Sequence, residues 1–240
     1  MIEKLKLLSI GDIKNMQREP LLLFALFGIL LLATVIRYGL PELDDIFNHF
    51  TAFSLQPHFQ IITGISLLMA PLMVGMLYGL IILDERDEGL LVYFSVTPIT
   101  KTGYLLARIT APVIVTFFMS YLFILVQGIA IWDWATFLPI SILLSLQAPI
   151  VTILLASLAS NKVEGLALIK VINLMLFAPL IDYIFSHPTA KFVMIFPLYW
   201  PVQAFMQIGK EPFWLYVITG LFVTVFWLWL FGQMFRRRNE

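Results

Sequence analysis

Six long apolar segments recur along the 240-residue chain, and they restrict its fold more than any other feature. An α-helix of about 20 apolar residues is long enough to cross the hydrocarbon core of a bilayer. Charged residues make up only 12% of the chain, about half their usual share in soluble domains. The short segments of alternating polarity that mark a transmembrane β-barrel do not occur. The sequence therefore predicts an all-α polytopic membrane protein, one domain over residues 1–240, with spans at 21–40, 59–83, 104–131, 136–159, 165–184 and 213–235.

The basic residues indicate how these spans are oriented. An even number of spans places both termini on one side of the membrane. Of the 15 Lys and Arg residues, 12 then lie on the side of the termini, and only Arg37, Lys191 and Lys210 lie on the other side. Because basic residues accumulate in cytoplasmic loops, we expect both termini and the loop at 84–103 to be cytoplasmic (N-in/C-in).

Residues 1–19 precede the first span and differ from it in pattern. Ile2, Leu5 and Leu8 alternate with lysines, and Pro20 follows the segment. This pattern favours an amphipathic interfacial helix on the cytoplasmic membrane surface, with a basic tail as the alternative.

Five charges crowd into residues 84–88, the acidic segment, directly after the second span. A helix C-terminus carries partial negative charge, so each carboxylate there is disfavoured by roughly 0.3–1 kcal/mol. The penalty disappears if the chain turns near Leu83 and a new helix begins, because the acids then lie at its N-terminus. Leu90, Leu91 and Phe94 share one face of that helix. We predict a cytoplasmic helix over 84–98 that binds a protein partner, with a solvated loop as the alternative.

The same stretch carries a family resemblance. Its order of residues resembles the loop between spans two and three in permeases of the ABC-2 type, most closely in the subgroup that exports fluoroquinolone drugs. Weaker similarities are "GDIKNMQREP" (11–20) and "FPLYWPVQAF" (196–205). Gly103 departs from the family, in which many members carry an acidic residue. The matching residues are Glu85-Arg86, Gly89-Leu90-Leu91, Val96-Thr97-Pro98 and Tyr104-Leu105-Leu106-Ala107-Arg108.

The resemblance implies a division of labour between subunits. Residues 84–98 would be the coupling helix that docks on a separate ABC ATPase subunit, and residues 1–19 would flank that subunit. Two ATPase copies, which bind ATP and magnesium, would serve two permeases, identical or homologous. Residues 185–212 would form an extracellular or re-entrant segment. The expected ATPase contact consists of Glu85, Arg86, Glu88, Gly89, Leu91 and Phe94.

Motifs for catalysis by this chain itself are absent from the sequence. The only Gly-Lys pair, Gly209-Lys210, is followed by Glu211, and Ala204 stands where a phosphate-binding loop needs its first glycine. The chain has no cysteine, and its three histidines lie in or beside predicted outer loops without metal-binding spacing. We therefore expect no enzyme activity, no cofactor and no metal in this chain, with energy supplied by the partner.

Polar side chains inside the spans are candidates for a substrate pathway. Polar groups in a membrane face a cavity or a neighbouring helix, and small hydroxyls also serve in helix packing. Both roles remain open for the candidate residues, which are Ser141, Ser145, Thr152 and Asn173.

The leading hypothesis is the permease subunit of an ATP-driven exporter in a bacterial plasma membrane. It would move hydrophobic or amphipathic substrates (drug, peptide or lipid-like) outward. The lipid bilayer would be a further partner, and we expect no nucleic-acid partner. The alternative is a secondary transporter driven by an ion gradient, which internal inverted repeats and paired intramembrane acids would support. A membrane enzyme is a third reading, opposed by the missing motifs.

Overall fold

The computed structural model describes residues 20–51, 53–89, 100–185 and 187–239, and within these ranges all regular structure is helical. The predicted all-α fold class is confirmed. The expected helix at 1–19 and residues 90–98 of the expected coupling helix lie outside the described ranges. The elements are α2 (Pro20–Thr51), η1 (Gln56–His58), α3 (Phe59–Leu67), α4 (Met69–Asp87), α6 (Thr100–Gln127), α7 (Trp134–Ser145), α8 (Gln147–Leu158), α9 (Lys162–Asn173), η2 (Leu174–Leu176), α10 (Phe177–Ile184), η3 (Pro188–Ile195), α11 (Tyr199–Met206) and α12 (Phe213–Asn239).

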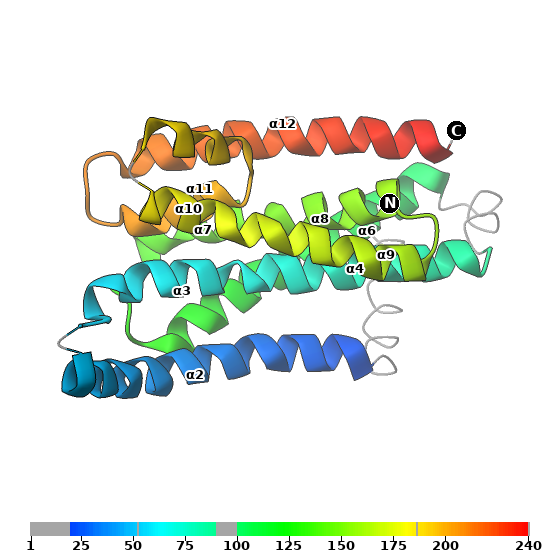
Figure 1. Cartoon of the computed structure of the whole chain (residues 1–240). Coiled ribbons are helices and arrows are strands. Elements are labelled where there is room, and N and C mark those ends of the chain that lie inside the picture. Colours follow the sequence, from blue (N-terminus) through cyan, green and yellow to red (C-terminus); the bar gives the residue numbers. More distant parts are fainter. Residues whose placement is uncertain (1–19, 52, 90–99, 186, 240) are drawn as a thin grey trace.

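Six helical segments of the described chain are long and apolar enough to cross a membrane, as predicted. Successive spans run in opposite directions, so α2 begins and α12 ends at the same end of the bundle (Figure 1). This end of the bundle also contains the last turn of α4, the start of α6 and the connection from α8 to α9. We call it the predicted cytoplasmic end. The opposite one is the predicted outer end. The spans are Leu26–Thr51, Gln56–Asp87, Arg108–Gln127, Trp134–Leu158, Lys162–Ile184 and Phe213–Phe235.

The first predicted span ends too early, because α2 continues through Pro41 to Thr51. Three other spans are broken into consecutive helices. A proline lacks the N–H that would bond to the carbonyl four residues before it, and its ring clashes with that carbonyl. Each break lies within the turn that precedes a proline, which accounts for its place. The pairs of break and proline are Leu68 with Pro71, Leu146 with Pro149, and Leu174–Leu176 with Pro179.

The most extensive helix contact among the described residues joins α4 to α8. A Cβ atom added to Gly75 would lie 2.5 Å from the carbonyl oxygen of Ala148, and one added to Gly79 would lie 2.8 Å from Leu155 Cδ1. The Thr152 hydroxyl donates to the Gly75 carbonyl at 3.0 Å. In lipid, apolar surface gains nothing by leaving its solvent, so helices associate through such close backbone packing. The spacing of two glycines four residues apart therefore fixes α8 against α4.

The segment between the last two spans folds back into the bundle. Helix α11 is buried along most of its length at the predicted outer end, where it lies beside α3, α7 and α12 without crossing to the other end (Figure 1). Gly220 of α12 admits this helix, because a Cβ there would lie 2.7 Å from Trp200 Cβ. The extracellular or re-entrant segment expected at 185–212 stays a prediction.

The contact between α4 and α8 gives a prediction for stability. Gly75→Ala forces the added methyl against the backbone of α8, so we expect it to lower the free energy of unfolding by about 1–3 kcal/mol. The control is Gly28→Ala on α2, where a Cβ meets no atom within 4 Å and the better helix propensity of alanine is neutral or stabilising. Thermal unfolding in detergent measures both variants. Equal midpoints for the two would contradict this account of the core.

Candidate functional site

The acidic segment ends α4 rather than beginning a new helix. Helix α4 runs without interruption to Asp87, Glu88 forms its C-cap, and the chain turns at Gly89 with φ 71°. The expected turn near Leu83 is therefore wrong. The carboxylates do lie at a helix C-terminus, where the backbone field disfavours them. The groups that offset this penalty come from other helices.

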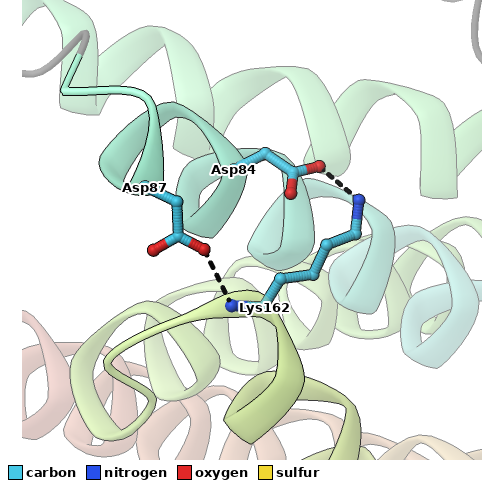
Figure 2. A network of polar contacts seen from close by, with 3 residues as sticks. All are labelled: Asp84, Asp87 and Lys162. Atoms are coloured by element: carbon cyan, nitrogen blue, oxygen red, sulfur yellow. Dashed lines mark hydrogen bonds and ion pairs between the residues drawn. The ribbon is translucent and has the colours of Figure 1, made fainter.

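Two of the acids contact the first residue of α9. The Lys162 ammonium lies 2.5 Å from the Asp84 carboxylate, and the Lys162 backbone N–H donates to Asp87 at 3.2 Å (Figure 2). Asp87 thus lies at the N-terminus of a helix, where a carboxylate is favoured, but the helix is α9. The expected electrostatic compensation exists, and a distant part of the sequence supplies it.

A third acid of the segment, Glu85, forms an ion pair with Arg108 of α6. Both side chains are largely buried, with 15% of Glu85 and 9% of Arg108 exposed. Removal of one partner from such a pair leaves a charge with little water around it, which is the costly case. The pair joins α4 to α6, the two helices on either side of residues 90–99.

The basic residue of the segment, Arg86, contacts the end of α8. Its guanidinium donates to the carbonyl oxygens of Ala156 at 2.8 Å and Ala159 at 3.0 Å. The last carbonyls of a helix lack partners within the helix and carry partial negative charge, so a cation there is favourable. Arg86 therefore caps α8 and holds it to α4.

The expected ATPase contact residues divide into three groups. Glu85 and Arg86 are engaged with other helices of this chain. Glu88 is exposed at the predicted cytoplasmic end, and Gly89 follows it at the turn. Leu91 and Phe94 lie outside the described residues.

Comparisons with known proteins agree with the motifs of this segment. The family model described as "Fluoroquinolones export permease protein Rv2686c-like" matches residues 12–232. The chain belongs to this family of permeases. Two relatives from strains of Mycobacterium tuberculosis, the fluoroquinolones export permease proteins MT2760 and Rv2686c, are each 23% identical over 237 residues. The match covers 95% of this chain and 92% of each relative, whereas no solved structure matches.

This membership confirms the resemblance to drug-export permeases of the ABC-2 type. The matched region includes most of the first span and the others up to residue 232, so the relationship concerns the whole membrane domain. Together with six membrane-capable helices, it identifies a multi-pass bacterial membrane protein and a transport subunit.

The pathway candidates of this permease are mostly buried within the single chain. Ser141, Ser145 and Thr152 are at most 2% exposed. The two serine hydroxyls donate to backbone carbonyls of their own helix, at 2.8 and 2.7 Å, and Thr152 bonds across to α4. These contacts favour the packing role over pathway lining for the three residues. Asn173 is half-buried at the last turn of α9.

A polar cluster at the predicted outer end was not foreseen. One carboxylate oxygen of Asp182 on α10 accepts from the Tyr199 hydroxyl at 2.9 Å and from Gln203 at 3.1 Å, both on α11. His58, expected to be a loop residue, lies 2.6 Å from the Tyr183 hydroxyl. Burial, reinforced by the bond to Asp182, raises the pKa of the Tyr199 phenol, which therefore remains a hydrogen-bond donor. The cluster holds α11 in place against the fifth span.

Proposed function

We propose that this permease is the membrane subunit of an ATP-driven exporter powered by a separate ATPase. The supporting observation is the anchored acidic segment. At the predicted cytoplasmic end, the residues that flank segment 90–99 are tied to three other helices, and the exposed Glu88 stands beside them. A segment held in this way transmits a force from a docked partner into the bundle, which a solvated loop would not do.

The sequence supports a permease whose ATPase is a separate subunit. The single Gly-Lys pair lies in the turn between α11 and α12, with Gly209 at φ 76° and Glu211 following, so it does not form a phosphate-binding loop. ATP hydrolysis would therefore belong to the partner, together with its magnesium. In this proposal two copies of the ATPase serve two copies of the permease, as in the transporters that the chain resembles.

The names of the relatives support a substrate class. Both named relatives are fluoroquinolones export permease proteins. We propose hydrophobic or amphipathic drugs as the cargo, moved outward, with a fluoroquinolone as the first compound to test.

The energy source separates this function from the secondary transporter. We expect a fluoroquinolone to accumulate in inside-out vesicles that contain the permease and its ATPase when ATP is supplied. Accumulation should persist when an ionophore collapses ion gradients, and it should stop when ATP is withheld. Uptake that needs the gradient but not ATP would establish the alternative function instead.

The exposed acid Glu88 provides a test of the docking surface. Glu88→Lys reverses a charge at the predicted contact without breaking an internal ion pair, so the ATPase should bind about tenfold more weakly while insertion is unchanged. The matched control is Glu211→Lys, an exposed acid at the predicted outer end, which should leave binding unchanged. Co-purification of the ATPase at increasing salt measures both variants. Equal retention in both would remove Glu88 from the contact.

A further inference from the structure

The ion pair between Glu85 and Arg108 joins the two arms of the expected docking segment. Glu85 lies on the last turn of α4, Arg108 lies on α6, and residues 90–99 lie between them in sequence. Both side chains are largely buried, so the pair is directed into the permease. A residue whose charge is already satisfied inside the chain presents little of that charge to a partner. Glu85 is therefore poorly placed to act as a direct ATPase contact.

The same turn of α4 also holds the ends of the fourth and fifth spans. Arg86 donates to two carbonyls at the end of α8, and Asp84 and Asp87 both bind Lys162 at the start of α9 (Figure 2). One helical turn thus contacts α6, α8 and α9 through directional polar interactions. We call these six residues the coupling clasp: Asp84, Glu85, Arg86, Asp87, Arg108 and Lys162.

Helices α4 and α8 are joined along their length as well as at this end. Gly75 and Gly79 bring the two backbones together from Ala148 to Leu155, and the clasp fastens their last turns. Both helices begin at a proline-dependent break, at Leu68 and Leu146. The two helices are therefore joined both along their length and at their last turns.

We propose that the coupling clasp transmits movement of the docking segment to the fourth and fifth spans. In this role Glu85 and Arg108 are positioning residues that act through the docking segment and do not touch the ATPase. The inference rests on the proposed function and gives it a route. A push on residues 90–99 reaches α4 and α6 together through the Glu85–Arg108 pair. It then reaches α8 through Arg86 and α9 through Lys162.

The chemistry of the clasp suits transmission better than stabilisation. A buried ion pair adds little net stability compared with apolar packing, because both charges lose their water. It does fix the register of the two helices, since only one arrangement satisfies both charges. The charged pair thus adds a directional connection between α4 and α6 to their side-chain packing, which suits the transmission of movement.

A charge exchange tests the inference in the complete permease–ATPase complex. We expect Glu85→Arg and Arg108→Glu singly to retain the bound ATPase and its ATP hydrolysis while drug transport falls about tenfold or more. The double exchange restores an opposite-charge pair, so transport should return to within about threefold of the original. Glu211→Arg, far from the clasp, should leave transport unchanged.

The outcomes separate the possible failures. If Glu85→Arg releases the ATPase and Arg108→Glu does not restore it, Glu85 is a direct contact and the inference is wrong. Unchanged transport in both single variants, or a double variant no better than either, also overturns it. If the unmodified permease retains no ATPase or shows no ATP-driven transport, the proposed function itself fails.

A second variant covers the case in which the exchanged proteins do not fold. The chain contains no cysteine, so Glu85→Cys with Arg108→Cys creates the only thiol pair. We expect low transport in this protein, and recovery when a short bismaleimide joins the two thiols in place of the ion pair. A monofunctional maleimide is the matched control. Recovery with the control reagent, or none with the linker, would overturn the inference.

Discussion

The contact between α4 and α8 is the constraint on which the rest of this permease depends. Two glycines bring the backbones so close that even a methyl group would collide, and a threonine hydroxyl crosses the contact to a carbonyl. Because lipid provides no hydrophobic force between helices, such packing and the hydrogen bond hold the second and fourth spans together. The other spans surround this pair, and α11 fills the space left at the predicted outer end.

The ends of that pair explain why a mostly apolar chain carries a dense group of charges. Helix α4 ends in acids that its own backbone disfavours, and α8 ends in carbonyls without partners. Basic residues compensate both groups, and each connects α4 to a different helix. Arg108 on α6 and Lys162 on α9 pair with the acids, and Arg86 on α4 bonds to the carbonyls that end α8. Because the compensating charges come from neighbouring helices, the same interactions that offset the unfavourable field at a helix terminus also connect the spans. These connections lie beside the segment where an ATPase would act.

The sequence was informative wherever a local pattern determines structure. Six spans follow from hydrophobic length, and the order of residues around Gly89 and Thr97-Pro98 indicated the family that the comparisons confirm. The helix dipole correctly indicated that these carboxylates need a compensating interaction. The predicted source, a new helix beginning near Leu83, was wrong, because the sequence does not reveal that Lys162, 78 residues from Asp84, lies within reach of it. His58 and Tyr183, 125 residues apart, were missed for the same reason.

The central claim is that the coupling clasp carries movement of α4 to α9 through Lys162, and a distance between these two helices tests it most directly. Spin labels at Ile81→Cys on α4 and Val163→Cys on α9 place one probe on each helix away from the predicted ATPase contact, at a half-buried and an exposed position in a chain without other thiols. The account predicts the same label distance in the permease–ATPase complex with and without bound ATP. A distance that changes between the two states would show that α4 moves without α9 and would contradict the account.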